Sequence, residues 1–223
     1  MDARLISIIV PALNEARGIG AALQALAPLR ARGHELIVVD GGSEDRTREI
    51  ATPLCDLLVV APRGRAVQMN AGARAAHGGA LVFLHADTRL PEGADREIAG
   101  CLEKHLWGRF DVDIEGRHRL LPVIAWAMNL RSRLTGIATG DQAIFVRRDA
   151  FEGFPEIALM EDVAFSKAMK RRGPPACLRS RVLTSGRRWE SRGVLRTLAL
   201  MWRLRLLYCL GARPEALARR YER

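Results

Sequence analysis

The sequence has few aromatic residues and no long hydrophobic run, and each shortage argues against a class of protein. Aromatic side chains make up 5% of the 223 residues, too few for the stacking surfaces with which proteins bind single-stranded nucleic acids. No stretch of 18 uncharged apolar residues occurs, so a membrane-spanning helix is not expected. Hydrophobic residues nevertheless make up 48% of the chain, which predicts a sizeable packed core.

Paired cysteines are also missing, and this absence indicates a cytoplasmic protein. The four cysteines form no CxxC pair, which argues against a metal knuckle or a disulfide framework; they are Cys55, Cys101, Cys177 and Cys209. We expect buried free thiols in a reducing compartment. The apolar run 5–10 is too short for the core of a secretory signal and is typical of a first strand. Contact with the inner face of the membrane is compatible with this location.

Lysine is scarce in a chain that is basic overall. The 35 Lys+Arg stand against 25 Asp+Glu, for a formal net charge of +10, and only three of the basic residues are lysines. Residues 163–223 hold 16 Lys+Arg against 3 Asp+Glu. Guanidinium groups suit phosphates better than ammonium groups do, so this region fits an anionic membrane, a phosphorylated substrate or a nucleic acid. The alternative is a solvated face in an arginine-rich proteome.

Strand patterns alternate with helical patterns through the first 90 residues. Helices begin near Asn14, Glu44 and Arg65, and strands are predicted over 5–10, 35–40, 57–60 and 81–84. The strands are unbroken apolar runs, as expected for strands that are buried on both faces. With short connections, this order predicts an α/β protein with a doubly wound, mostly parallel sheet.

The pattern changes after residue 88. Helices are predicted over 91–104, 120–130 and 194–210, and another helix ends near Arg172. Strands are predicted over 109–115 and 142–147. Polar and apolar residues alternate over 109–115, which predicts a strand with one exposed face. In the last helix, Arg205 falls on the side opposite to Arg192, Arg196 and Arg203. The apolar residues of that helix would pack on the domain or lie on a membrane.

Acidic residues follow two of the predicted strands. Asp40 ends one strand and precedes two glycines, and Asp87 closely follows the apolar run 81–84. The carboxyl ends of parallel strands meet at one edge of a sheet, where ligands bind, and an aspartate there can bind a divalent cation. The glycines let the backbone come close to a ligand. The alternative is that both segments are turns with helix caps.

Several segments share the order and spacing of a known family. Residues 10–15 (Val-Pro-Ala-Leu-Asn-Glu), 39–45 (Val-Asp-Gly-Gly-Ser-Glu-Asp) and 83–87 (Phe-Leu-His-Ala-Asp) resemble the family-two glycosyltransferases of the GT-A fold. Residues 63–72 look like that family's Asn-and-Gly helix start. Residues 140–142 and 161–162 sit where the family has an acceptor-side loop and a catalytic-base motif. The small size is similar to a compact bacterial subgroup, some members of which carry an arsenosugar-type label.

The resemblance implies an organisation and a reaction. It implies a GT-A, Rossmann-like domain over residues 1–190, with a nucleotide-binding half (1–90), an acceptor half (91–190) and a basic helical C-terminal appendage (191–223). The reaction would move a sugar from a nucleoside diphosphate sugar of the UDP or GDP type to the hydroxyl of a small-molecule or lipid acceptor. One catalytic base and no covalent intermediate imply inversion at the anomeric carbon.

The resemblance also implies roles for single residues. Asp162 would be the general base, Glu161 would orient it or the acceptor, and Asp87 would bind Mg²⁺ or Mn²⁺ on the diphosphate. The acceptor or the diphosphate would meet Gly140, Asp141 and Gln142. The donor nucleotide would be bound by Pro11, Glu15, Asp40, Gly42, Arg65, Asn70 and Ala86. The alternative for the acidic pair is two acids placed at a helix N-terminus, where the helix dipole stabilises them.

The chain departs from the family pattern at two places. His85 stands where the family has an acid; imidazole can bind Mn²⁺ but suits Mg²⁺ poorly, and the alternative is a packed, hydrogen-bonded histidine. Larger members carry Gln-x-x-Arg-Trp, whereas this chain has Arg187, Arg188 and Trp189 without the glutamine. We expect an arginine to reach the diphosphate and the tryptophan to stack on the acceptor or close the site. All three would otherwise be surface residues.

Other functions fit the sequence less well. A sugar nucleotidyltransferase would use a similar nucleotide site. A Rossmann oxidoreductase would need a third glycine after Gly18 and Gly20 at a place where none occurs. A non-catalytic protein that binds nucleotides or nucleic acid would use the basic C-terminal region, but the scarcity of aromatic residues argues against nucleic acid.

Overall fold

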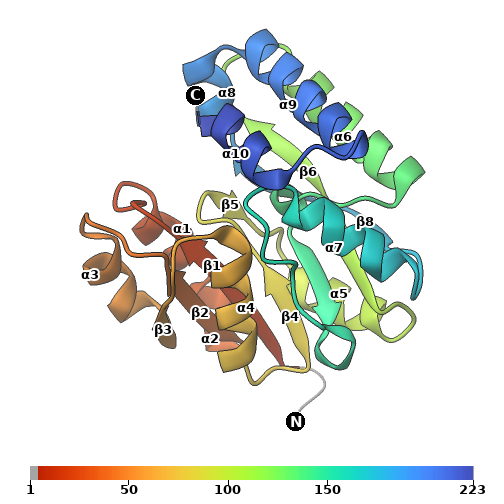
Figure 1. Cartoon of the computed structure of the whole chain (residues 1–223). Coiled ribbons are helices and arrows are strands. Elements are labelled where there is room, and N and C mark those ends of the chain that lie inside the picture. Colours follow the sequence, from red (N-terminus) through yellow and green to blue (C-terminus); the bar gives the residue numbers. More distant parts are fainter. Residues whose placement is uncertain (1–4, 223) are drawn as a thin grey trace.

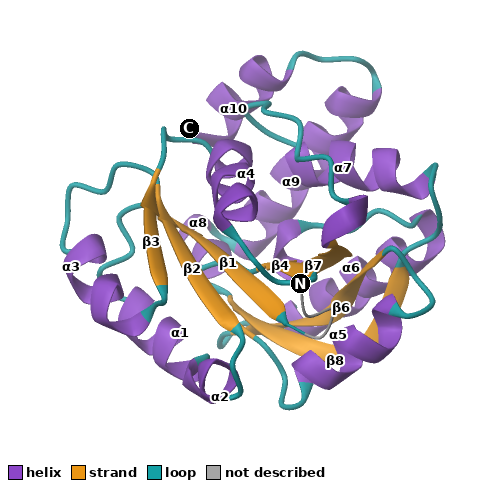
Figure 2. Cartoon of the chain, turned by 90° about the horizontal axis from the view of Figure 1, so that it is seen from below, coloured by secondary structure: helices purple, strands orange, loops and turns teal. Residues whose placement is uncertain are grey.

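The computed structural model describes residues 5–222, which form a mixed eight-stranded sheet with helices on both faces (Figures 1 and 2). One half of the sheet is parallel, in the order β3-β2-β1-β4. Its strands are β1 (Ile6–Ala12), β2 (Glu35–Asp40), β3 (Leu57–Val60) and β4 (Ala80–Phe83). The predicted α/β class and the four predicted strands are confirmed.

The other half of the sheet is mostly antiparallel. From β4 onward the order is β7 (Ile144–Arg147), β6 (Trp107–Glu115), β8 (Ala176–Ser185) and β5 (Thr88–Arg89). Only β6 and β8 run parallel in this half. The sequence did not predict β5 or β8, because β5 has two residues and β8 mixes charged and apolar residues. Their pairing brings Ser185 to the segment after β4, where its amide donates to the carbonyl of Asp87 at 3.2 Å.

Two apolar cores cover the two faces of the sheet. The helices that cover them are α1 (Ile19–Ala25), α2 (Ala27–Ala31), α4 (Arg65–Ala75), α5 (Ala94–Leu102), α6 (Leu121–Thr135) and α7 (Glu161–Lys170). Side chains of β1 alternate, so that Ile8 lies in the core under α1, α5 and α6 while Ile9 lies in the core under α4 and α7. Figure 2 shows α4 and α1 on opposite faces. A short helix, α3 (Thr47–Ala51), follows β2.

The C-terminal helices pack together beside α7. They are α8 (Arg187–Arg192), α9 (Val194–Cys209) and α10 (Pro214–Glu222), of which α9 was predicted. Leu204 of α9 and Leu217 of α10 join Met160 and Val163 in a third, small core. In Figure 1 these blue helices lie above the parallel strands. No helix within residues 5–222 is both long enough and apolar enough to cross a bilayer.

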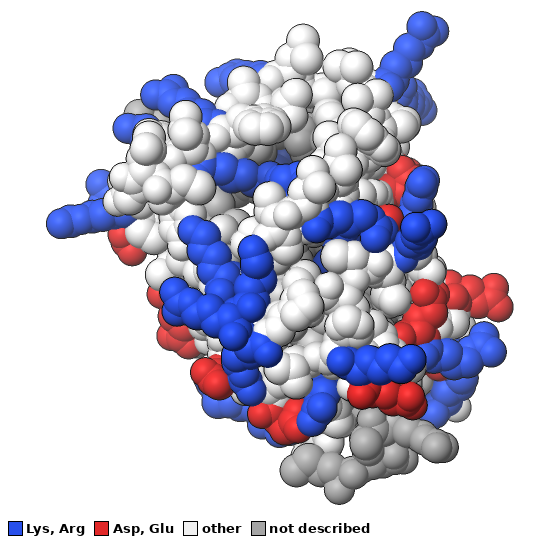
Figure 3. All heavy atoms as spheres, turned by 90° about the vertical axis from the view of Figure 1, so that its right-hand side faces the viewer, with Lys and Arg blue, Asp and Glu red and all other residues white. Residues whose placement is uncertain are grey.

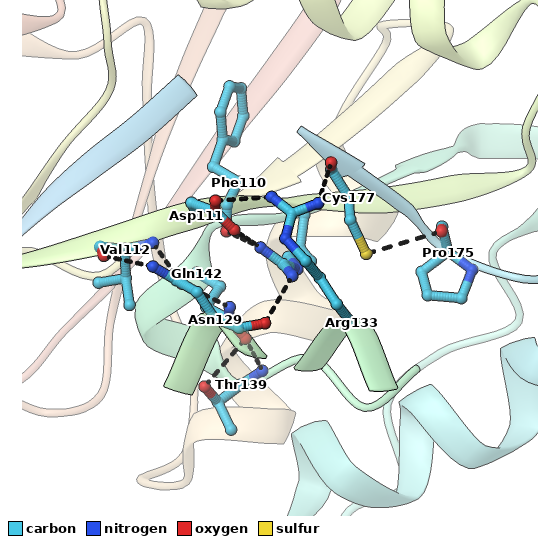
Figure 4. Close-up of polar contacts among 10 residues, drawn as sticks. Phe110, Asp111, Val112, Asn129, Arg133, Thr139, Gln142, Pro175 and Cys177 are labelled. Carbon is cyan, nitrogen blue, oxygen red and sulfur yellow. Dashed lines mark hydrogen bonds and ion pairs between the residues drawn. The ribbon is translucent and has the colours of Figure 1, made fainter. Parts of the chain in front are cut away.

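The strand over 109–115 alternates as predicted, with one exception. The side chains of Asp113 and Glu115 are 42% and 58% exposed, and the apolar residues between the acids are buried. The exception is Arg109, which is 0% exposed, and the neighbouring carboxylate of Asp111 pairs with it and with Arg133. Figure 4 shows Asp111 and Arg133 among polar contacts that run from β6 to α6 and β8.

The expectation of buried thiols was wrong. The cysteines are free, but Cys209 is exposed and the other three are half-buried.

Gly72 sets the distance between α4 and the sheet. A Cβ atom at this position would lie 2.5 Å from Cγ2 of Ile9 and 2.9 Å from Cγ2 of Val39. Only a residue without a side chain therefore allows α4 to pack this closely on β1 and β2.

We predict that Gly72→Ala lowers the free energy of unfolding by about 1–3 kcal/mol, because it overpacks the core. Urea unfolding followed by circular dichroism measures the change. Gly100→Ala is the matched control, since a Cβ atom there meets nothing within 4 Å in helix α5. Equal stability of the two variants would contradict this account of α4.

Candidate active site

A cavity of about 720 Å³ lies where β1 and β4 end. The segments after these strands form one wall, and the turn 139–141 with the start of α7 forms another. Residues of α8, α9 and α10 complete it. The edge of the sheet at which the sequence predicts a ligand site is therefore covered by the C-terminal helices.

Most of the residues predicted for the site line this one cavity. They are Pro11, Glu15, Arg65, His85, Ala86, Asp87, Gly140, Asp141, Glu161, Asp162, Arg187, Arg188 and Trp189. The remaining predicted residues, Asp40, Gly42, Asn70 and Gln142, are not among its lining residues.

Asp40 lies just behind the cavity wall. It pairs in register with Ala12, which does line the cavity, and its side chain is 0% exposed. One carboxylate oxygen accepts hydrogen bonds from the amides of Gly42 and Ser43, both at 3.0 Å. The other oxygen is buried and has no hydrogen-bond partner within residues 5–222. Asp40 therefore holds the glycine turn through one oxygen, and its second oxygen takes no part in holding the turn.

Buried amide side chains fix the loops around the cavity. Asn70 exchanges two hydrogen bonds with the backbone of Phe154, at 2.8 and 2.9 Å, and so anchors the loop that leads to α7. Gln142 accepts from the amide of Thr139 at 3.2 Å and donates to Asn129 of α6 at 3.4 Å (Figure 4). Both residues were predicted to meet ligands, and in the structure their polar atoms are used to position the backbone.

The sequence does not single out Gln68, because nothing in it marks a helical glutamine as buried. It is 4% exposed, and its amide nitrogen donates to the carbonyls of Ala12 at 2.9 Å and Val39 at 2.8 Å. A Cβ atom on Gly41 would lie 2.9 Å from this side chain. The glycine after Asp40 is thus needed for close packing of α4 against the turn.

The acidic pair stands at the start of α7. Asp162 accepts a hydrogen bond from the amide of Gly140 at 3.0 Å and faces the cavity. Glu161 is 3% exposed, and its carboxylate lies 3.4 Å from Nη1 of Arg65. Burial and the charge of Asp162 raise the pKa of Glu161, and Arg65 offsets part of this effect. The two adjacent carboxylates therefore have different environments.

His85 lies against the turn that carries Asp141. Its Nδ1 is 3.2 Å from a carboxylate oxygen of Asp141, and a Cβ atom on Gly140 would lie 2.3 Å from Nε2. Burial opposes ionisation of Asp141, but the hydrogen bond and charge of His85, with Arg65 and Arg188, leave its pKa below the ordinary value. This geometry favours the packed, hydrogen-bonded reading of His85.

Two arginines of α8 line the cavity. Arg187 places Nη2 3.4 Å from the carboxylate of Glu15 and 3.9 Å from that of Asp87. Arg188 lies over the ring of Tyr221 at 4.7 Å. Burial and the charges of Arg65 and Arg192 lower the pKa of Arg188. The Arg-Arg-Trp segment is therefore placed at the cavity, as the sequence predicts.

Backbone strain is concentrated at the same place. Within residues 5–222, the non-glycine residues with positive φ are Asn14 (55°), Ala143 (46°) and Met160 (71°). Asn14 and Met160 adjoin Glu15 and Glu161, which line the cavity, and Ala143 follows the turn that brings Asp141 to it. Such conformations are costly and are typical of functional sites.

The helices α9 and α10 contribute cavity residues that sequence reasoning did not assign. They are Thr197, Met201, Arg205, Ala218 and Tyr221. The sequence set one of these residues apart: Arg205 falls on the opposite side of its helix from the other arginines.

The comparison with family models identifies one family. The model described as "Glycosyl transferase family 2" matches residues 7–152, about two thirds of the chain. The matched range includes Asp40 and Asp87, and it ends before Asp162. Among curated proteins, a "PGL/p-HBAD biosynthesis glycosyltransferase" of Mycobacterium bovis and one of Mycobacterium tuberculosis are each 38% identical over 99 residues. Those matches cover 41% of this chain and 39% of the relatives.

Solved structures share the fold. S. aureus TarS in complex with UDP-GlcNAc matches 82% of this chain and 59% of its own, with a TM-score of 0.66 and 19% identity. A second match is glucosyl-3-phosphoglycerate synthase from Mycobacterium tuberculosis in complex with Mn²⁺, UDP and phosphoglyceric acid. It covers 93% of this chain and 79% of the synthase chain, with a TM-score of 0.65 and 21% identity. These likenesses confirm the predicted GT-A type of fold.

Proposed function

We propose that this chain, which belongs to glycosyl transferase family 2, moves a sugar from a nucleoside diphosphate sugar to an acceptor hydroxyl with inversion. One observation carries the proposal: Asp87 and Asp162, far apart in sequence, line one cavity together with several arginines. The structural neighbours named as complexes with UDP or UDP-GlcNAc favour UDP as the nucleotide. The acceptor would enter on the side of α7 and α9.

On the donor side, the residues present fit a divalent cation. The side chain of Asp87 is 35% exposed, and its carboxylate oxygens are donors that Mg²⁺ and Mn²⁺ prefer. Within residues 5–222, no cluster of three metal-ligating side chains occurs, so the donor's diphosphate and water would supply the other ligands. His85 places Nδ1 beside Asp141, and its Nε2 is buried against Gly140, so we assign Asp87 alone as the protein ligand. A bound cation would neutralise charge on the leaving diphosphate.

The arginines of α8 have a complementary role on this side. Arg187 already lies beside Asp87 and Glu15, and Arg188 lines the same wall. Both would donate hydrogen bonds to the diphosphate as its negative charge grows during transfer. Trp189 would close this end of the cavity.

On the acceptor side, we assign Asp162 as the general base. The amide of Gly140 holds one of its oxygens at 3.0 Å, which fixes the carboxylate toward the cavity. Direct displacement at the anomeric carbon needs a carboxylate that removes the hydroxyl proton on the face opposite to the leaving group. Glu161 and Arg65 pair beside it and would keep the start of α7 in place.

We further propose that the protein works at an anionic membrane surface. Large apolar side chains are exposed along α6 and α9: Val123, Trp126, Leu130 and Leu134 on the first helix, and Leu195, Trp202 and Leu206 on the second, with Leu210 directly after it. Each set falls on one face of its helix. The sequences of α6 and α9 contain arginine but no acidic residue, and the uppermost part of the face in Figure 3 is white and blue without red.

This pattern favours lipid over a second copy of the chain. Apolar helix faces flanked by arginine suit the boundary between headgroups and acyl chains. Two copies that met through these faces would place like charges near one another. A peripheral position at the membrane would bring a lipid acceptor to the cavity.

We predict that Asp162→Asn lowers turnover of a UDP-sugar by about 10²–10⁴-fold, because the proton acceptor is lost, while affinity for UDP stays within about threefold. Released UDP is measured over a panel of UDP-sugars and acceptors, and UDP affinity by calorimetry. Asp149→Asn is the control, since Asp149 pairs with Arg147 on the surface. Unchanged turnover in Asp162→Asn would remove it as the base, and release of pyrophosphate would indicate nucleotidyl transfer.

We predict that replacing both Trp126 and Trp202 with Ser weakens binding to phosphatidylglycerol-containing vesicles by at least about tenfold, since each buried apolar side chain contributes roughly 1.5–3 kcal/mol. Co-sedimentation measures the binding. Val60→Ser is the control, because Val60 is equally apolar and 60% exposed but lies on β3. Unchanged binding, or a wild-type dimer that the double variant abolishes, would contradict the membrane proposal.

A further inference from the structure

The charges that line the cavity are paired at one end and unpaired at the other. Near the strand ends, Arg65 lies beside Glu161 and Arg187 beside Glu15 and Asp87. At the C-terminal end, Arg205 lines the cavity, and within residues 5–222 no carboxylate lies within ion-pair distance of it. The C-terminal end of the cavity therefore has an excess of positive charge.

Arg205 belongs to a row of residues on one face of α9. Thr197, Met201 and Arg205 are spaced by four residues and all line the cavity. Thr197 is 5% exposed, and its hydroxyl is buried without a hydrogen-bond partner in the described chain. The Nε of Arg205 is also buried and unpartnered. Buried polar groups in native proteins are nearly always hydrogen-bonded, so this pair indicates a missing ligand.

A second cation lies behind Arg205. Nε and Nη2 of Arg131 on α6 are buried without a partner. Burial and the charge of Arg205 lower the pKa of Arg131 to about 10, and burial lowers the pKa of Arg205 as well. Two partly buried guanidinium groups that repel each other are costly without an anion. The neighbouring acids, Asp162 and Asp141, offset this cost only in part.

We infer that Arg205 forms a subsite that binds a phosphate group carried by the acceptor, and that Thr197, about 12 Å away along the helix axis, donates to another oxygen of the same acceptor. A guanidinium fork suits phosphate oxygens. Asp162 lines the same cavity, so an acceptor anchored by its phosphate would present a hydroxyl to the base. The inference rests on the proposed function and narrows it to phosphate-bearing acceptors.

The phosphate could belong to a soluble molecule or to a lipid headgroup. Met201 stands between Thr197 and Arg205 in the row, and the outer face of the same helix exposes Trp202 and Leu206. Both sources share the phosphate chemistry, so two probes are needed to separate them.

The test is calorimetric titration of the full chain, saturated with UDP so that the donor's diphosphate position is filled. The probes are glycerol 3-phosphate, dihexanoyl phosphatidic acid used as monomers, and glycerol as the uncharged control. We expect at least one phosphate probe to bind and glycerol to show no binding. Arg205→Ala should weaken that binding more than tenfold, Arg205→Lys less, and Thr197→Ala about threefold.

Controls separate this inference from the proposed function. Arg203→Ala removes an exposed arginine on a different side of α9. This variant should bind the probes as the wild type does. Every variant should keep wild-type affinity for UDP, which also shows that it folds; Arg205→Gln replaces Arg205→Ala if the latter does not. Probe binding that is independent of Arg205, with UDP binding intact, overturns the subsite alone. If the wild type does not bind UDP, both the proposed function and the subsite are overturned.

Discussion

Gly140 is the point on which the geometry of the cavity depends. Its amide donates to Asp162 at 3.0 Å, and its missing side chain leaves room for the ring of His85, which a Cβ atom would approach to 2.3 Å. One residue thus joins the end of β4, the turn 139–142 and the start of α7. Any side chain at this position would push apart the segments that carry Asp87 and Asp162.

A buried polar network supports that turn from behind. Gln142 bonds to Thr139 and to Asn129, and Asn129 exchanges two hydrogen bonds with Val112 of β6, both at 2.9 Å. The antiparallel half of the sheet therefore positions the proposed acceptor side, while the parallel half positions the proposed donor side. The C-terminal helices complete both, because α8 brings Arg187 to Asp87 and α9 brings Arg205 to the far end.

The sequence predicted the parts of the fold that have a local pattern. The four parallel strands were recognisable because burial on both faces requires unbroken apolar runs, and α9 because its length and periodicity are plain. The strand β8 and the burial of Arg109 could not be predicted, since both depend on ion pairs and strand partners far away in sequence. For the same reason, Asn70 and Gln142 were expected at the ligand, although their amides hold loops. The family motifs identified Asp87 and Asp162 as candidate residues, whereas no motif marked Arg205.

The central claim is that Asp87 and its surroundings bind a nucleoside diphosphate together with a divalent cation. Calorimetric titration with UDP, with and without Mn²⁺, tests this claim directly in the wild type and in Asp87→Ala. The account predicts that Mn²⁺ strengthens UDP binding by at least about tenfold in the wild type and by less than about twofold in the variant. Equal strengthening by Mn²⁺ in both proteins would contradict it.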